Sequence, residues 1–250
     1  MDRWNGRVAL VTGASAGIGE SVAKELVRSG MTVMGCARSV ENVQKLAAEC
    51  QREGLSGVLV PFKCDLSHEE EILSMFAAIR EQHEGVDVCI NNAGCAHSEP
   101  LLSGETSAWK NMLDVNVLGL CICTREAYQS MKERRVDDGH IININGMSGH
   151  RVPNMAAAHF YSSTKFAVTA LTEGLRQELR EANSHIRVSS IAPGLVRTDL
   201  ARRLEGDEIQ DYNKFKMLEA IDVANSVIYA LSAPPHVQVG DIRMRPVEEY

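Results

Sequence analysis

The chain has 250 residues, of which 44% are hydrophobic, and this length suffices to bury the core of one α/β domain. The formal net charge of −7 and the lack of a basic block argue against nucleic acid or an anionic membrane surface as a partner. No run of about eighteen apolar residues occurs, and no apolar run follows a positive segment after Met1, so we expect a cytoplasmic protein without a membrane span. Seven scattered cysteines without paired spacings predict reduced, mostly buried thiols and no metal site.

Short apolar segments alternate with helical patterns along the whole chain, which predicts a parallel sheet covered by helices on both faces. Strands are expected near residues 7–12, 32–37, 58–63, 87–91, 139–145, 186–191 and 238–242. Helices are expected near residues 17–29, 40–53, 69–83, 106–134, 158–182 and 221–232, with a shorter one within 198–217. Right-handed crossovers would wind these elements into a single doubly wound α/β domain of the Rossmann type over residues 1–250, with the ligand at the carboxyl ends of the strands.

The first predicted strand leads directly into a glycine-rich loop. Arg7-Val8-Ala9-Leu10-Val11-Thr12 is followed by Gly13-Ala14-Ser15-Ala16-Gly17-Ile18-Gly19, and a helical pattern then continues through Arg28. A buried strand, a glycine turn and a helix N-terminus form a dinucleotide site, because the backbone can approach the pyrophosphate and free N–H groups face its charge. The residues expected to contact the cofactor here are Gly13, Ser15, Ala16, Gly17, Ile18 and Gly19.

The end of the second predicted strand indicates which dinucleotide is bound. An NAD-selective site places an acidic residue there to bind the ribose 2′-hydroxyl. This chain has Ala37, Arg38 and Ser39 instead, which leave space and a positive charge for a 2′-phosphate. We therefore expect NADP(H) as the cofactor, with Arg38 and Ser39 beside the phosphate. The alternative is that Arg38 is a solvated charge at a strand end.

Two further loops follow strands at the same edge of the predicted sheet. Asn91-Asn92-Ala93-Gly94 ends the fourth strand, and its small residues allow close approach to the cofactor ribose. Its two asparagines could instead tie neighbouring strands together. Pro193-Gly194 follows the sixth strand as a rigid turn, and beyond it the Val196 N–H and the Thr198 hydroxyl suit the nicotinamide carboxamide.

The polar, loosely patterned residues 199–217 come next. A long irregular segment in a compact domain tends to be functional, so we expect a mobile lid over the substrate pocket. Together with residues 152–160, this lid would set specificity. Neither segment offers a charged anchor that the sequence can place, which favours a largely apolar substrate.

Tyr161 and Lys165 stand four residues apart at the start of a long helical pattern, so their side chains share one face of the helix. A phenol has an unperturbed pKa of about 10, and a nearby ammonium stabilises the phenolate and lowers that pKa. Such a tyrosine can exchange a proton with an alcohol or a carbonyl. Taken alone, the spacing is more typical of an ordinary surface pair, but the dinucleotide motif upstream favours a catalytic role.

Four motifs together identify a family. The segment from Thr12 to Gly19, the Asn91-Asn92-Ala93-Gly94 run, Tyr161 with Lys165, and Pro193-Gly194 resemble those of the short-chain dehydrogenases/reductases, and the resemblance covers essentially the whole chain. The run Thr-Arg-Glu-Ala-Tyr-Gln-Ser-Met-Lys-Glu-Arg from Thr124, and the Asp-Asp-Gly-His-Ile-Ile-Asn-Ile-Asn that follows it, are similar to a vertebrate subgroup and to insect farnesol dehydrogenases.

The resemblance implies an NADP(H)-dependent oxidoreductase that moves hydride between the nicotinamide and an apolar carbonyl or alcohol. The substrates implied are ketosteroids, dicarbonyls and isoprenoid alcohols such as farnesol. Two alternatives stay open, because fold and cofactor do not decide chemistry. One is a catalytically weak NADP-binding sensor or scaffold protein, and the other is a racemase, epimerase or dehydratase on the same fold.

The resemblance also implies roles for single residues around the reaction. Tyr161 exchanges the proton with the substrate oxygen, while Lys165 holds the cofactor ribose. Asn116 holds a water that links Lys165 to solvent, and an irregularity of its helix would serve this relay. The alternative for Asn116 is a buried amide that neighbouring backbone groups satisfy.

At the adenine end, the resemblance concerns the residues that close the third strand. Asp65 is implied to accept a hydrogen bond from the adenine amino group, while Leu66 flanks the ring. The alternative is that Asp65 caps the following helix, although Ser67 is also available for that role.

One departure from the family pattern concerns a serine. In the family, a serine directly follows the fifth strand and its hydroxyl binds the substrate carbonyl oxygen beside the tyrosine. Counting from the strand that ends at Asn145 puts Gly146 in that position, whereas counting back from Tyr161 by the commonest family spacing gives Ser148. A strand end determines where the next side chain points, so we expect Gly146 at the substrate and slow turnover. The alternative is that loop rearrangement brings the Ser148 hydroxyl to the same spot.

The two long helices expected at residues 106–134 and 158–182 predict self-association. Apolar residues lie around more than one face of the first helix: Leu118, Leu120, Ile122 and Ala127. In the family these two helices pair into a four-helix interface, so the resemblance implies a homodimer or a homotetramer.

Overall fold

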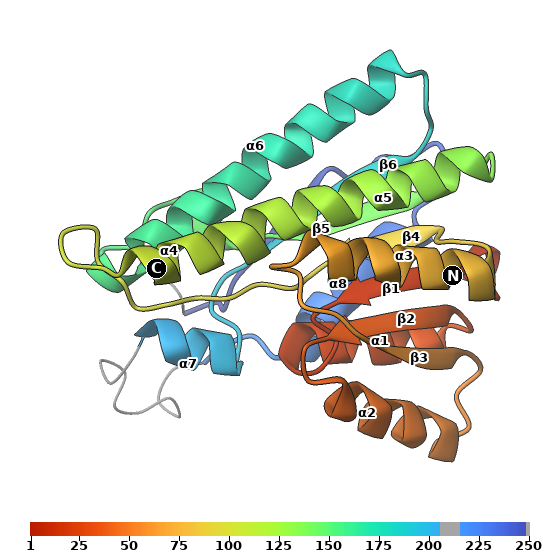
Figure 1. Cartoon of the computed structure of the whole chain (residues 1–250), viewed down its shortest axis with the longest axis horizontal. Coiled ribbons are helices and arrows are strands. Elements are labelled where there is room, and N and C mark those ends of the chain that lie inside the picture. The colour runs from red at the N-terminus through yellow and green to blue at the C-terminus, as the bar shows by residue number, and fades with distance from the viewer. Residues whose placement is uncertain (206–215, 249–250) are drawn as a thin grey trace.

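One parallel sheet organises the chain (Figure 1). The computed structural model describes residues 1–205 and 216–248, and within them the strand order is β3-β2-β1-β4-β5-β6-β7. The strands are β1 (Val8–Thr12), β2 (Thr32–Ala37), β3 (Val58–Lys63), β4 (Val88–Asn91), β5 (His140–Ile144), β6 (Arg187–Pro193) and β7 (Asp241–Met244). The order reverses between β1 and β4, as in a doubly wound Rossmann sheet. The predicted fold class is confirmed.

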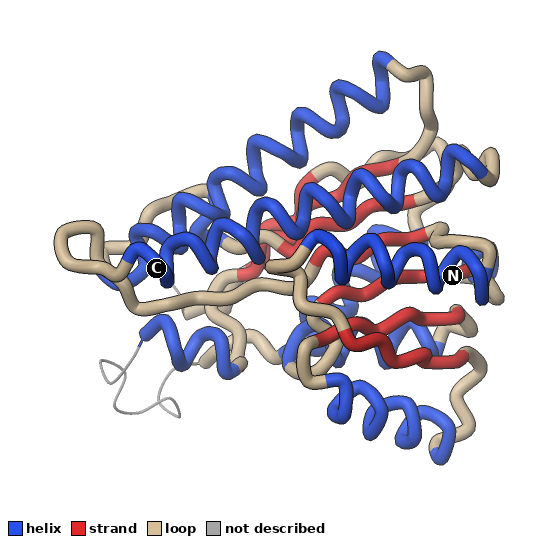
Figure 2. Tube along the Cα trace, viewed as in Figure 1, coloured by secondary structure: helices blue, strands red, loops and turns tan. Residues whose placement is uncertain are grey.

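Helices cover both faces of the sheet, and Figure 2 shows the strands between them. The helices of the described residues are α1 (Gly17–Arg28), α2 (Val40–Arg52), α3 (Glu69–His83), α4 (Thr106–Leu113), α5 (Leu120–Glu133), α6 (His159–Glu181), α7 (Asp199–Glu205) and α8 (Ala220–Ser232). Short 3₁₀ turns occupy Asp2–Trp4, Met147–Gly149 and Ala156–Ala158. None of these helices combines the length and the apolar character that crossing a bilayer requires.

Strand β1 shows why the sheet needs a layer on each side. All five of its residues are buried. Ala9 and Val11 join a cluster with α1, α2 and α8, whereas Val8 and Leu10 join a second cluster with α3, α5 and α6. Successive side chains of a strand point to opposite faces, so a continuous apolar run is stable only between two layers.

The predicted helix at 106–134 is interrupted, because residues Asp114–Gly119 form a π-helical segment between α4 and α5. The irregularity expected at Asn116 is therefore present. Each turn of a π-helix takes up an extra residue, and such segments inside α-helices are frequent at functional sites.

The last strand lies later than predicted, at Asp241–Met244 instead of 238–242. Val237 N–H closes a turn onto Pro234 O at 2.8 Å, and pairing with β6 begins only where Ser190 N–H donates to Gly240 O at 2.8 Å. Val237 and Val239 therefore precede β7, and their alternation does not mark a strand. Within the predicted lid at 199–217, the helical part is α7, and residues 206–215 lie outside the described residues.

Only part of the predicted apolar surface of the first long helix is exposed. Leu118 is 55% exposed, but Leu120, Ile122 and Ala127 are buried in the chain's own core, so the expectation for these three is wrong. The side chains of Ile122 and Ala127 pack in the cluster between α5 and the sheet. Other exposed apolar side chains lie near Leu118 in the sequence or on α6, namely Leu113, Phe166 and Leu171.

Candidate active site

A cavity of about 920 Å³ lies at the carboxyl ends of the strands. Most of the residues selected from the sequence line it: Gly13, Ser15, Ala16, Gly17, Ile18, Arg38, Ser39, Asp65, Leu66, Asn92, Ala93, Gly94, Gly146, Ser148, Tyr161, Lys165, Pro193, Gly194, Val196 and Thr198. Gly19 and Asn116 do not line the cavity but contact residues that do. Gly19 lies against the Gly13 carbonyl, and Asn116 Oδ1 accepts the Cys95 N–H. The elements that carry these residues are far apart in the chain, and the sheet brings them to one edge.

Two glycines of the loop have no room for a side chain. Gly13 has φ +68°, and a Cβ on it would lie 2.9 Å from Ala93 Cα. A Cβ on Gly19 would collide with the Gly13 carbonyl oxygen and the Asn92 amide. Helix α1 begins at Gly17, so its first N–H groups, which have no partner within the helix, lie at this loop. The loop therefore fits a pyrophosphate held by backbone N–H groups.

The asparagine motif supports this loop from behind. Asn92 Nδ2 donates to Thr12 O at 2.8 Å, and the backbone N–H groups of Asn92 and Ala93 both donate to Thr12 Oγ1 at 3.0 Å. Asn91 Nδ2 donates to Asn143 Oδ1 at 2.9 Å, which joins β4 to β5. The alternative that these asparagines tie strands together is thus observed, and Thr12 is a positioning residue that the sequence analysis missed.

The adenine end of the cavity contains Arg38 and the turn around Asp65. Asp65 Oδ1 accepts hydrogen bonds from Ser67 N–H at 3.0 Å and Ser67 Oγ at 2.8 Å. Partial burial alone would raise the pKa of Asp65, but these hydrogen bonds outweigh it and lower the pKa. The capping alternative is wrong for both residues, because the N-cap of α3 is His68.

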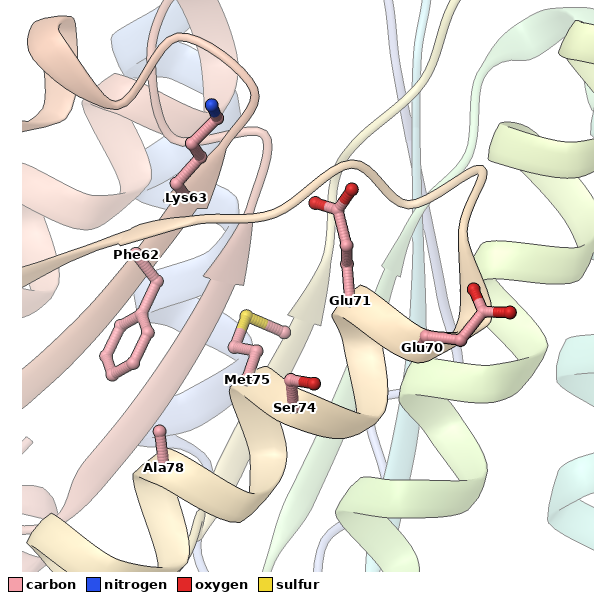
Figure 3. Close-up of a pocket in the computed structure, with 7 residues that line it drawn as sticks. All are labelled: Phe62, Lys63, Glu70, Glu71, Ser74, Met75 and Ala78. Carbon is pink, nitrogen blue, oxygen red and sulfur yellow. The ribbon is translucent and has the colours of Figure 1, made fainter.

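A second, smaller hollow of about 310 Å³ lies between β3 and α3 (Figure 3). Phe62, Met75 and Ala78 form its apolar wall, and Glu71 points from α3 toward the passing loop. Glu71 Oε2 accepts the Asp65 N–H at 2.8 Å. Glu71 therefore stabilises the turn around Asp65 at the adenine end of the cavity.

Tyr161 and Lys165 enter the cavity from the first turns of α6. The Lys165 ammonium lies 5.7 Å from the centre of the Tyr161 ring, and the two side chains share a helix face as predicted. Lys165 Nζ donates to Ile144 O at 3.0 Å, which ties α6 to the end of β5. The side chains are almost fully buried, at 8% and 6% exposure.

The pKa of Tyr161 shifts in the direction opposite to the one expected. Desolvation raises the pKa of Tyr161 above its ordinary value instead of lowering it, because the charged phenolate is disfavoured in the protein interior. Desolvation also lowers the pKa of Lys165 to about 8. In this arrangement the phenol is protonated at neutral pH and able to donate.

Asn116 lies in the π-helical segment, and its amide is occupied by the protein. Its Oδ1 accepts Cys95 N–H at 2.7 Å, while Nδ2 donates to Cys95 O at 2.8 Å and to Thr164 Oγ1 at 3.1 Å. The alternative of a buried amide satisfied by neighbouring groups is therefore observed. These bonds connect the loop after β4 to the residue before Lys165.

The structure puts Gly146 two residues after the end of β5. Asn145 N–H still donates to Ile191 O at 2.7 Å, so the strand geometry continues to the residue before Gly146. Gly146 has φ 169°, an extended conformation open to any residue. Ser148 lies in the 3₁₀ turn that follows, and both residues line the cavity.

The end of the cavity around Tyr161 is apolar, and the segments 152–160 and 199–217, which were predicted to set specificity, supply part of it. The residues after β4 and on α4 were not predicted. Tyr161 packs in a cluster whose members come from the loop after β4, from α4, from the turn before α6, from the start of α6 and from α7: Ala96, Met112, Ala158, Leu204, Cys95, Trp109, Met155, Phe160 and Leu200. Trp109 and Phe160 stack with ring centres 5.2 Å apart. The spacing of Leu200 and Leu204 could have indicated an apolar helix face.

Two arginines from or next to the predicted specificity segments also line the cavity. Arg151 comes from the loop before the predicted specificity segment, and Arg203 comes from α7 within the predicted lid. Leu218 pairs with the segment after β6: Arg197 N–H donates to its carbonyl and its N–H donates to Leu195 O, both at 2.9 Å.

Comparisons with known proteins agree with this geometry. The model of a family described as short chain dehydrogenase matches residues 7–209. Dehydrogenase/reductase SDR family member 11 of Gallus gallus is 64% identical over 253 residues, which cover 100% of this chain and 99% of the relative. A farnesol dehydrogenase of Aedes aegypti is 44% identical over 252 residues, which cover 100% of this chain and 99% of the relative. A solved closed form of serine dehydrogenase with NADP+ has a TM-score of 0.85 and 31% identity, and covers 97% of this chain and 96% of that chain. The chain therefore belongs to the short-chain dehydrogenase family.

Proposed function

We propose that the protein is an NADPH-dependent carbonyl reductase that also works in reverse as an alcohol dehydrogenase. The observation that carries this proposal is one cavity that joins the glycine loop and Arg38 to Tyr161 and Lys165. A dinucleotide site alone would serve a sensor equally well. A buried phenol at the same cavity supplies the proton that carbonyl reduction needs.

The cavity suits NADP(H) more than NAD(H). Arg38 lines it just after Ala37, and an acidic side chain for the ribose 2′-hydroxyl is lacking at these two positions. The serine dehydrogenase relative was solved with NADP+. The backbone of the Gly13 loop would hold the pyrophosphate, Asp65 and Leu66 the adenine, and the segment from Pro193 to Thr198 the nicotinamide carboxamide.

Tyr161 acts as the proton donor in this proposal. Its raised pKa keeps the phenol protonated at neutral pH, which is the form that can donate a proton to a carbonyl oxygen. The cofactor, when bound, supplies the hydride. Lys165 holds the ribose, and Asn116 would keep the proton path to solvent through the groups around Cys95 and Thr164.

Gly146 would weaken the site relative to the family pattern, in which the resemblance implies a serine at this position. Position 146, two residues after β5, carries no hydroxyl to stabilise the developing alkoxide, and losing one such donor typically costs about 10²–10³ in rate. We therefore propose normal cofactor binding with slow turnover. Ser148 from the neighbouring 3₁₀ turn is the alternative donor.

The substrate is an apolar carbonyl compound or alcohol. The members of the Tyr161 cluster that line the cavity are apolar alanine, methionine and leucine side chains, which suit a carbon skeleton without demanding polar groups. Ketosteroids, dicarbonyls and isoprenoid aldehydes or alcohols are the classes to test first. One of the relatives is a farnesol dehydrogenase.

We also propose that residues 1–250 form one domain with a lid in 199–217, and that two or four copies assemble. Leu118 and Phe166 are exposed on neighbouring helices, and a second copy would remove them from water. In Figure 1, α5 and α6 run along the same side of the molecule.

The experiment is an NADPH-oxidation screen across ketosteroids, dicarbonyls and isoprenoid aldehydes, with the alcohol product identified for each active compound. Consumption of NADPH in equal amount to the alcohol supports the proposal. Tight NADPH binding without consumption by any carbonyl would instead favour the sensor or scaffold. Gly146 is the observation that favours that alternative.

A further inference from the structure

A threonine of α6 contacts both ends of the segment that carries Gly146 and Ser148. Thr169 Oγ1 accepts a hydrogen bond from Asn145 Nδ2 at 2.8 Å and donates one to Gly149 O at 2.9 Å. Gly146 and Ser148 lie between these two contacts, and both line the cavity. The 146–148 segment is therefore attached to α6 directly before and directly after it.

The direction of each hydrogen bond at Thr169 follows from its single hydroxyl proton. Gly149 O at 2.9 Å is a closer acceptor for this proton than Lys165 O at 3.3 Å. The hydroxyl oxygen keeps its lone pairs for Asn145 Nδ2, which can only donate. Asn145 Oδ1 is buried and has no hydrogen-bond partner among residues 1–205 and 216–248. Thr169 is therefore the partner that orients the Asn145 side chain.

The 3₁₀ turn also packs closely against α6 at this point. A Cβ on Gly149 would lie 2.7 Å from both Lys165 O and Asn145 Oδ1, so the approach requires a glycine. Lys165 Nζ donates to Ile144 O at 3.0 Å, one residue before Asn145. The end of β5 and the turn that follows it are thus held by two side chains of one helix, Lys165 and Thr169.

Thr169 shares a helix face with the proposed proton donor. It lies four residues after Lys165 and eight after Tyr161, so the three side chains follow one another along α6. The position of the 146–148 segment relative to the Tyr161 phenol therefore depends on the Thr169 hydroxyl. A misplacement of about 1 Å caused by a residue away from the reacting atoms can cost about 10²-fold in rate.

We propose that Thr169 is a positioning residue of the reductase, and that it sets the place of the 146–148 segment relative to the Tyr161 phenol. The inference rests on the proposed reductase function and adds a residue that does not itself line the cavity. It holds whether position 146 or position 148 supplies the hydroxyl to the substrate oxygen, because both lie between Asn145 and Gly149.

The test compares two threonines of α6. Thr172 makes the same kind of contact further along the helix, since its Oγ1 accepts a hydrogen bond from Asn143 Nδ2 at 2.9 Å and donates one to Val168 O at 2.7 Å. Thr172 is 1% exposed, and its partner Asn143 lies within β5 instead of beside the turn. Thr172→Val therefore removes an equally bonded and more deeply buried hydroxyl, and it is the matched control for Thr169→Val.

Single-turnover NADPH oxidation with one carbonyl substrate gives the rate, and titration of NADPH gives its Kd, both below the unfolding transition of every variant. Thr169→Val should lower the rate about tenfold and leave the NADPH Kd within about twofold of wild type, because the segment shifts while the cofactor loops do not. Thr169→Ser, which keeps the hydroxyl, should retain the wild-type rate within about threefold. Thr172→Val should retain it within about twofold.

A second readout uses Gly146→Ser, which adds a hydroxyl within the segment that Thr169 holds. Any gain in rate from this substitution should shrink to less than about threefold in the Thr169→Val background and persist in the Thr172→Val background. A gain of about tenfold in both backgrounds would overturn the inference.

Equal rates in Thr169→Val and Thr172→Val would overturn it too, and so would a loss in Thr169→Ser as large as that in Thr169→Val. If wild type reduces a carbonyl and these comparisons fail, only the role of Thr169 is lost. If wild type binds NADPH but reduces no carbonyl, the proposed reductase function itself fails.

Discussion

A Cβ atom on Gly146 would lie 3.8 Å from the Pro193 carbonyl oxygen, in ordinary van der Waals contact and with no closer neighbour among the described residues. Because the backbone there is also extended, a serine fits without strain. We predict that Gly146→Ser raises kcat at least about tenfold with one good carbonyl substrate, since it restores a donor to the alkoxide. Steady-state NADPH oxidation measures this.

Ser148→Ala is the matched variant, because Ser148 is the alternative donor in the next turn. It should change kcat by less than about twofold in the wild-type background. Loss of activity in Ser148→Ala would show that the assignment based on the strand end is wrong and that the 3₁₀ turn supplies the hydroxyl.

The second prediction concerns cofactor choice. Arg38→Asp should raise the KM for NADPH by at least about tenfold, ~1.4 kcal/mol, and should affect NADH much less. The reason is that the aspartate repels the 2′-phosphate but can bind a 2′-hydroxyl. Arg52→Asp, the same charge change at the distant end of α2, is the control and should alter neither constant. Equal effects of Arg38→Asp on both cofactors would contradict the assignment.

The third prediction follows from the lowered pKa of Lys165. Below about pH 8 both the folded and the unfolded chain hold this proton, so its contribution to stability is constant. Between that pH and about 10.4, the value for an unfolded lysine, only the unfolded chain keeps the proton, and stability therefore rises with pH. Urea unfolding of the cofactor-free protein should show wild type gaining about 1–2 kcal/mol over Lys165→Met between pH 8 and pH 10. Parallel pH profiles would show that the ammonium is solvated.

The glycine loop and the paired Tyr161 and Lys165 were predictable because their chemistry depends on local spacing. A helix puts residues four apart on one face, and a strand followed by glycines and a helix N-terminus is typical of a dinucleotide site. The sheet was predictable for a related reason, since β1 is apolar on both faces and its neighbours share that pattern.

What could not be predicted depends on contacts between distant residues. Spacing places Lys165 near Tyr161, but only the packed structure shows that burial raises the phenol's pKa. The partners of Asn116 lie at Cys95 and Thr164, which no local pattern connects. The apolar cluster around Tyr161 depends on where α7 packs against the turn before α6, and loop conformations do not follow from periodicity.

The fourth prediction is that the protein sediments with at least twice the mass of one chain at micromolar concentration. Leu118→Asp should shift it toward the monomer, because a buried carboxylate at a subunit interface is costly. Leu102→Asp introduces the same change at a fully exposed site in the loop before α4 and is the control. A wild-type monomer would contradict the predicted assembly.

The central claim is that Tyr161 is the proton donor of an NADPH-dependent carbonyl reductase. Tyr161→Phe removes one oxygen from a side chain packed in an apolar cluster, so folding should be preserved. The most direct test measures NADPH binding and single-turnover NADPH oxidation with one carbonyl substrate in wild type and Tyr161→Phe. The account predicts an NADPH Kd within about twofold of wild type and an oxidation rate lower by about 10²–10⁴. An unchanged oxidation rate with intact NADPH binding would contradict it.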